Sequence, residues 1–223
     1  MPREIKAAKI ARAEAIEERM LAHYGEGECS LDYENDPFRL VCAVVLSAQC
    51  TDAAVNKVTP ALFEKYPSCY DLAQAKLKDV EKIIHSLGFF RSKAANLVKL
   101  SQMLVSDFAG VVPNDLEELQ KLPGVGRKTA NVVMCEAFRN AQGIAVDTHV
   151  YRIAHRLRFA GPSADTPDKT EKALLSIYPQ KDWLFINHQW VHFGREFCRA
   201  QRPRCADCII GDLCPSFRGE NQG

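Results

Sequence analysis

The stretch "LQKLPGVGRKTANVV", residues 119–133, decides the fold because it places a glycine hairpin between two segments of helical periodicity. Asn114 is followed three residues later by Glu117, a spacing typical of a capping box, and this predicts a short helix that ends at Pro123. Beyond Gly126 a second helix is predicted by apolar residues at helical spacing, namely Ala130, Val133, Met134 and Ala137. The segment is therefore expected to be helix, hairpin, helix.

The two glycines of this hairpin allow its backbone to approach a ligand closely. Without Cβ atoms, Gly124 and Gly126 can adopt unusual dihedrals and expose their N–H groups. Those donors precede a helix N-terminus, where the backbone dipoles favour an anion. A nucleic-acid phosphate is the candidate ligand. A plain tight turn between packed helices is the alternative, whereas the glycine and lysine spacing of a Walker loop is absent.

The rest of the chain also shows helical periodicity, and no alternating strand pattern or Asn-Gly hairpin interrupts it. Asp36 is a predicted N-cap with Pro37 at the first helical position, and the apolar residues after it surround the helix axis. Further helices are expected over 52–66, 77–87 and 92–108. The sequence predicts an all-α protein with two helical lobes.

Composition excludes several classes of protein. The chain has 223 residues and a net charge of +1, so any binding of nucleic acid depends on locally arranged charge. No apolar run approaches the ~20 residues of a membrane span. The N-terminal segment lacks the apolar block of a signal peptide, and its glutamates argue against a transit peptide. We expect a cytoplasmic monomer that does not bind membranes and, in a bacterium, associates with the nucleoid.

Two titratable residues lie at predicted helix starts. Lys128 follows the hairpin, and lysine forms Schiff bases with aldehyde carbons when its amine is free. An amine that is free near neutral pH requires a shift worth about 4 kcal/mol, of which a helix N-terminus supplies at most about 2 kcal/mol. We therefore expect Lys128 to line an enclosed groove. Asp147 is a predicted N-cap, and a capping carboxylate should remain ionised at neutral pH.

Nine cysteines divide into two groups. Five are scattered through apolar helical sequence, as is typical of buried thiols, and they are Cys29, Cys42, Cys50, Cys69 and Cys135. The other four are crowded in one short loop at intervals C-x6-C-x2-C-x5-C, and they are Cys198, Cys205, Cys208 and Cys214. Four thiolates can bind either one zinc ion or a [4Fe–4S] cluster. The residues alone leave both open.

The hairpin followed by Lys128, the "VDTH" segment around Asp147, and the cysteine spacing together resemble the endonuclease III family of DNA glycosylases. "LSAQCTD" (46–52) and "LGFFRSKA" (87–94) are similar to the two loops of that family that enter the duplex. The resemblance covers residues from about 38 to 214. It implies a bifunctional glycosylase and abasic-site lyase that removes oxidised pyrimidines from double-stranded DNA in base excision repair.

The same resemblance implies roles for individual residues. Lys128 would attack C1′ of the flipped nucleoside and Asp147 would assist, while Gln49 and Leu87 would fill the gap in the duplex. The hairpin residues implied to grip the strand are Gly124, Val125, Gly126 and Arg127. The four crowded cysteines would bind a [4Fe–4S] cluster. This cluster would support a basic loop that contacts DNA through Arg195, Arg199, Arg202 and Arg204.

The resemblance also implies a domain organisation. A six-helix barrel with the helix-hairpin-helix is expected over 30–141, and an iron–sulfur domain over 1–29 and 142–223, with a DNA-binding cleft between them. Two alternatives remain. The first is a glycosylase of the same fold for alkylated or mismatched bases, and the second is a noncatalytic helix-hairpin-helix DNA-binding module.

Overall fold

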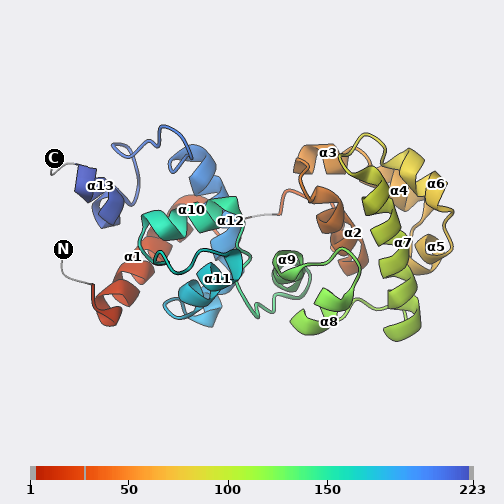
Figure 1. Ribbon diagram of the computed structural model, residues 1–223, viewed down its shortest axis with the longest axis horizontal. Helices are drawn as coiled ribbons and strands as arrows, with labels where there is room; N and C mark the ends of the chain where they lie inside the picture. The colour runs from red at the N-terminus through yellow and green to blue at the C-terminus, as the bar shows by residue number, and fades with distance from the viewer. Residues whose placement is uncertain (1–3, 28, 221–223) are drawn as a thin grey trace. The chain divides into compact units, whose positions relative to one another are not determined.

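The computed structural model describes residues 4–27 and 29–220, and it contains no strand in these residues, which confirms the all-α prediction (Figure 1). None of the helices in that part of the chain has the length and apolarity needed to cross a bilayer. The α-helices are α1 (Lys6–Tyr24), α2 (Pro37–Ser47), α3 (Asp52–Asn56), α4 (Thr59–Lys65), α5 (Cys69–Ala73), α6 (Leu77–Ile83), α7 (Phe90–Asp107), α8 (Leu116–Lys121), α9 (Arg127–Phe138), α10 (Thr148–Arg156), α11 (Pro167–Leu175), α12 (Trp183–Glu196) and α13 (Pro215–Glu220). Two 3-10 helices, η1 (Gln180–Asp182) and η2 (Gly211–Leu213), complete the set.

The chain divides into two compact units, one of Met1–Glu28 with Ala141–Gly223 and the other of Cys29–Asn140. The first unit therefore joins the N-terminal helix to the last third of the chain. The domain assignments made from the sequence, a six-helix barrel over 30–141 and an iron–sulfur domain over 1–29 and 142–223, stay predictions. Residues 1–3, 28 and 221–223 of those ranges lie outside the described residues.

The first unit is held together by an apolar core that α1 shares with helices from the second half of the chain. Ala13, Ile16 and Met20 lie on one face of α1 and are fully buried. They belong to the same core as Trp190 of α12 and Val150 of α10. Figure 1 shows α1 beside α12, the helix with which it packs. This packing fixes α10, and with it Asp147, against the C-terminal segments.

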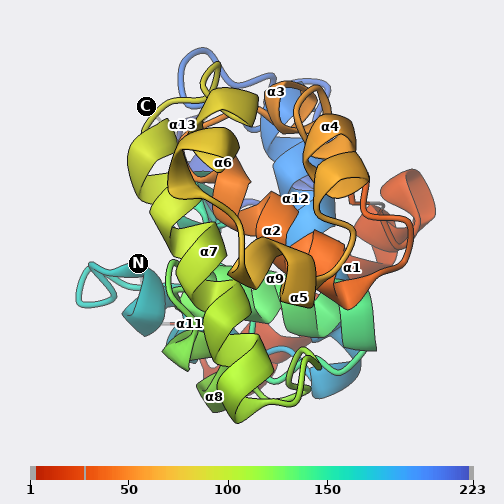
Figure 2. The ribbon, with the colours of Figure 1, turned by 90° about the vertical axis from the view of Figure 1, so that its right-hand side faces the viewer.

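In the second unit α7 packs against α5, α6 and α2, and α2 packs in turn against α9 (Figure 2). The first helix of this unit, α2, begins as the sequence predicts. The Asp36 side chain accepts hydrogen bonds from the N–H groups of Phe38 and Arg39, and Pro37 occupies the first turn. Phe38 and the seven consecutive residues 40–46 of α2 are buried, so this helix lies inside the unit.

Two predicted helices are shorter or broken in the structure. The segment 52–66 forms α3 and α4, because Pro60 has no N–H to donate and so favours the first turn of a new helix. The helix predicted over 77–87 ends at Ile83, and α7 begins at Phe90 after a turn in which Phe89 adopts a left-handed φ of 56°. That turn carries the residues of the second predicted wedge.

Candidate functional site

The predicted helix-hairpin-helix is formed by α8, a turn over 122–126, and α9. Gly124 has φ of 84°, a conformation that side chains rarely adopt. A Cβ at this position would also lie 2.8 Å from Nδ2 of Asn96 on α7. The first glycine of the hairpin is therefore required by the fold itself, through both its backbone conformation and its packing.

The second glycine has a different environment. Gly126 has φ of −87° and ψ of 174°, which any residue can adopt, and a Cβ here would meet nothing within 4 Å. It is the N-cap of α9, and no side chain caps this helix. Val125 is buried beside it, with its N–H donating to the Leu122 carbonyl at 3.0 Å. The fold does not need glycine at 126, and the space before the first turn of α9 is open to a ligand.

The start of α8 differs from the predicted capping box. Asp115 is the N-cap, and its side chain accepts from the N–H groups of Glu117 and Glu118, both at 2.9 Å. Asn114 instead accepts a hydrogen bond from Nδ2 of Asn140 at 3.0 Å. The prediction was wrong by one residue because Asn and Asp cap helices equally well, and periodicity cannot choose between neighbours.

Lys128 lies in the first turn of α9, next to the half-buried Arg127, and its side chain is exposed. The expectation that Lys128 lines an enclosed groove is therefore wrong. The reason is its position. A residue two places after an uncapped helix start projects beyond the packed face, which α9 forms with residues 130–135. The packed face of its own unit leaves this amine exposed.

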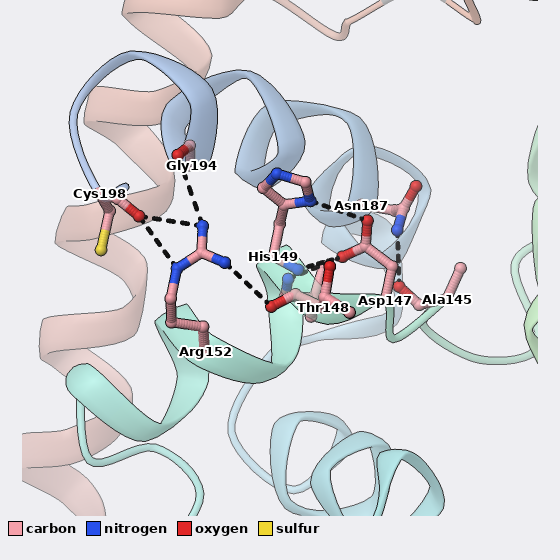
Figure 3. A network of polar contacts seen from close by, with 9 residues as sticks. Ala145, Asp147, Thr148, His149, Arg152, Asn187, Gly194 and Cys198 are labelled. Carbon is pink, nitrogen blue, oxygen red and sulfur yellow. Dashed lines mark hydrogen bonds and ion pairs between the residues drawn. The ribbon is translucent and has the colours of Figure 1, made fainter. Parts of the chain in front are cut away.

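Asp147 caps α10 as predicted. Its Oδ1 accepts from the N–H groups of His149 and Val150, both at 2.8 Å, and its Oδ2 lies 3.2 Å from Nδ1 of His149 (Figure 3). The side chain keeps 20% of its surface exposed. The carboxylate is therefore held in one orientation by three contacts while one edge stays accessible. Lys128 and Asp147 belong to different units of the chain.

Arg152 is a residue that the sequence analysis missed. One turn after Asp147 on α10, its guanidinium donates to the Cys198 carbonyl at 3.0 and 3.1 Å and to the Gly194 carbonyl at 3.4 Å (Figure 3). These acceptors lie at the end of α12 and the start of the cysteine-rich loop. Arg152 therefore connects the helix capped by Asp147 to the first crowded cysteine. An arginine on a helix gives no sequence signal for such a role.

The four crowded cysteines border one cavity of about 200 Å³, together with apolar side chains and Arg156 and Arg204. Burial raises the pKa of the Cys208 thiol to about 11, and the charges of the other three thiols add to this rise. Nη1 of Arg156 lies 3.2 Å from the sulfur of Cys198. The sequence analysis thus grouped four residues that the fold brings around a single space.

The four arginines predicted to contact DNA are all exposed, and they are Arg195, Arg199, Arg202 and Arg204. Arg204 pairs with Asp207 at 3.1 Å, which offsets part of its charge, and Nε of Arg199 donates to the Arg195 carbonyl. They flank the loop that the cysteines organise. A cationic surface of this kind can contact phosphates.

The two predicted wedge residues differ in exposure. Gln49 is exposed and has a left-handed φ of 56°. Leu87 is only 3% exposed and belongs to the apolar core, so its side chain is not presented to a ligand in this structure. Phe89, two residues later, is 67% exposed. The sequence analysis overlooked Phe89 because periodicity does not reveal which apolar residue of a turn faces outward.

Comparisons with known proteins agree with this arrangement of motifs. Residues 42–180 match the family model described as HhH-GPD superfamily base excision DNA repair protein. Endonuclease III of Synechocystis sp. is 45% identical, covering 94% of each chain, and endonuclease III of Bacillus subtilis is 48% identical, covering 86% of each chain. The solved structure of a trapped endonuclease III–DNA covalent intermediate has a TM-score of 0.86 and 43% identity, covering 95% of this chain and 98% of that one.

Proposed function

Since the chain belongs to the endonuclease III family of HhH-GPD base excision DNA repair proteins, we propose that it removes oxidised pyrimidines from duplex DNA with Lys128 as its nucleophile. It is a DNA glycosylase and abasic-site lyase that acts on double-stranded DNA. Such an enzyme works where the chromosome lies, which in a bacterium is the nucleoid in the cytoplasm. The observation that supports the choice of nucleophile is the exposed lysine directly after an uncapped glycine hairpin.

The hairpin is proposed to hold a phosphate of the damaged strand. The first N–H groups of a helix have no intrahelical acceptor, and α9 has no side-chain cap to satisfy them. The open space at Gly126 would let a phosphate oxygen reach these donors. Arg127 adds a positive charge at the same end of the helix. A strand bound in this way passes beside Lys128, and we propose that the strand shelters the amine from water.

In the proposed reaction, the free amine of Lys128 forms a bond to C1′ of the flipped nucleoside as the C1′–N bond to the damaged base breaks. The amine loses both of its protons in this sequence. One leaves with the base, the other goes to the ring oxygen as the sugar ring opens, and an imine remains. Loss of a C2′ proton then breaks the bond from C3′ to its oxygen and nicks the strand. Asp147, held by its capping contacts, is proposed to stabilise the cationic sugar and to accept the proton released by the amine.

Base extrusion costs a few kcal/mol, so a side chain must replace the extruded nucleotide in the stack. Gln49 is proposed to enter the duplex, because it is exposed at the end of a tight turn. On the second loop we propose Phe89 in place of Leu87, because an exposed aromatic ring can stack on the neighbouring bases and a buried leucine cannot.

A [4Fe–4S] cluster is proposed as the cofactor. A cavity of about 200 Å³ is far larger than one metal ion, and it is bordered by all four thiols, so these residues fit a multi-atom group. Cys198, Cys205, Cys208 and Cys214 would each bind one iron, and Arg156 would donate to the Cys198 sulfur. The cluster would supply a covalent staple for the loop that carries Arg195, Arg199, Arg202 and Arg204.

A substrate panel tests this function. The purified protein is incubated with duplexes that carry thymine glycol, 5-hydroxycytosine, 3-methyladenine or mispaired adenine, and strand cleavage is measured without added alkali. We expect cleavage at the two oxidised pyrimidines. Cleavage restricted to 3-methyladenine or mispaired adenine would support a glycosylase of different specificity. Binding to every duplex with no cleavage would support a noncatalytic DNA-binding module.

A further inference from the structure

Cys50 lies at the point where the two loops that carry Gln49 and Phe89 meet. It directly follows Gln49, and its N–H donates to the Ser47 carbonyl at 2.9 Å. A Cβ added at Gly88, the residue before Phe89, would lie 3.9 Å from the Cys50 sulfur. The thiol is half-buried, so small molecules can reach it. Chemistry at this sulfur therefore acts on both loops at once.

The same sulfur accepts a hydrogen bond from Lys93 of α7, whose Nζ lies 3.0 Å away. Lys93 is only 4% exposed, and burial of a lysine is costly unless its amine is paired. In the part of the chain that the structure describes, this amine has a thiol as its partner and forms no ion pair with a carboxylate. A buried amine is thus aimed at a sulfur within reach of a covalent bond.

The other cysteines outside the crowded loop have environments that suppress thiol reactivity. Burial raises the pKa of Cys29 to about 11 and that of Cys135 to about 12. Cys42 and Cys69 are buried. Oxidation-sensitive cysteines are partly exposed and have a cationic neighbour. Cys50 has both features.

We propose that Cys50 is an oxidative modification site and that Lys93 captures the oxidised sulfur in a reversible sulfur–nitrogen cross-link. Hydrogen peroxide oxidises the thiol to a sulfenic acid and is itself reduced to water. The Lys93 ammonium first gives a proton to water, and the lone pair of the resulting amine attacks the sulfur, forming the S–N bond and breaking the S–O bond. The oxygen leaves as water with one proton from the nitrogen. The chain loses two hydrogens overall.

The cross-link would join the loop of Gln49 to the first turns of α7, which begin directly after Phe89. Gln49 and Phe89 both have left-handed backbone conformations in short turns. A bond between Cys50 and Lys93, the neighbours of these turns, would restrict the movement that insertion into a duplex needs. Two thiol molecules reverse the link by breaking the S–N bond, which regenerates Cys50 and Lys93 and yields a disulfide. The effect on activity rests on the proposed function, whereas the cross-link itself does not.

Mass spectrometry of the full-length protein with its cofactor tests the cross-link. The protein is treated with limiting hydrogen peroxide, alkylated and digested. We expect the peptides of Cys50 and Lys93 to be joined, with a mass about 2 Da below their sum, and to separate after treatment with dithiothreitol. Sulfinic or sulfonic acid at Cys50 without a joined peptide would overturn the proposal, as would an unmodified Cys50.

Variants connect the cross-link to activity. Cys50→Ser keeps a hydrogen-bond acceptor for Lys93 but cannot form the bond, so peroxide should leave its base excision unchanged. In the native protein, peroxide should lower the rate of base excision on duplex DNA by more than about tenfold, and dithiothreitol should restore it. If peroxide lowers base excision equally in the native protein and in Cys50→Ser, the proposal that the cross-link controls duplex opening is overturned. Lys93→Met should show oxidised Cys50 without a joined peptide. Failure of the untreated native protein to excise any base would instead count against the proposed function.

Discussion

At the level of single residues, Asp147 is both a helix cap and a proposed reactant, and substitution separates these two roles. Asn caps a helix as well as Asp does, so Asp147→Asn should change the free energy of unfolding by less than about 0.5 kcal/mol. Loss of the charge should lower base excision by about 10²–10⁴-fold. Asp115→Asn is the matched control, because Asp115 caps α8 in the same way. Single-turnover kinetics would measure base excision, and urea unfolding would measure the free energy of unfolding. Equal rates of base excision in the two variants would contradict a role for Asp147 in the reaction.

Glu17, buried in α1, gives the protein a pH-dependent stability. Burial, with a contribution from the charge of Asp182, raises the pKa of this carboxyl from 4.5 to about 7. Between pH 4.5 and about 7, Glu17 is deprotonated in the unfolded chain and protonated in the folded chain. The free energy of unfolding therefore falls as pH rises through this range, by roughly 3 kcal/mol in total. Glu17→Gln should therefore stabilise the protein at pH 8 and have little effect below pH 4.5. Urea unfolding at several pH values tests this against Glu18→Gln, an exposed neighbour on the same helix, which should show no such trend.

The limits of sequence-based prediction are clearest at Lys128 and Leu87. The chemistry of Lys128 suggested a sheltered amine, but shelter depends on what packs around a side chain, and its place in the first turn of α9 leaves it exposed. Leu87 and Phe89 are both apolar and flank one glycine. Only the backbone of the turn, with φ of 56° at Phe89, determines which of them faces outward. By contrast, the grouping of four cysteines followed directly from their spacing.

At the level of elements, the hairpin allows the requirements of the fold and those of DNA binding to be tested separately. Gly126→Ala introduces a methyl group into open space at an ordinary φ, so it should cost less than about 1 kcal/mol of stability while weakening the binding of duplex DNA. Gly124→Ala should cost about 1–3 kcal/mol, because φ of 84° is strained for alanine and Asn96 lies in the way. Thermal unfolding would measure the stability of the two variants, and fluorescence anisotropy would measure their affinity for duplex DNA. Unchanged DNA affinity in Gly126→Ala would contradict the phosphate contact.

Helix boundaries were predictable where a residue has a fixed backbone preference. Asp36 with Pro37 marks the start of α2 because a capping carboxylate and a proline both suit the first turn. The break before α4 follows from Pro60 by the same reasoning, although apolar periodicity alone suggested one continuous helix over 52–66. The contacts of Arg152 could not be predicted, since its acceptors are backbone carbonyls brought near by tertiary packing.

At the level of the whole molecule, the cysteine-rich loop connects the stability of its unit to DNA binding. Cys208→Ser should lose the absorption around 400 nm that iron–sulfur proteins show, and it should lower the unfolding temperature and the affinity for DNA together. The reason is that the same loop carries the exposed arginines. Cys29→Ser, in the other unit, is the control. Retention of the absorption in Cys208→Ser would exclude this thiol as a ligand.

The central claim is that Lys128 forms the covalent intermediate. Trapping the native protein on abasic duplex DNA with borohydride, followed by digestion and mass spectrometry, locates the modified lysine directly. The account predicts a sugar adduct on Lys128 and no adduct in Lys128→Gln, which should still bind the duplex. An adduct on another lysine, or none in the native protein, would contradict it.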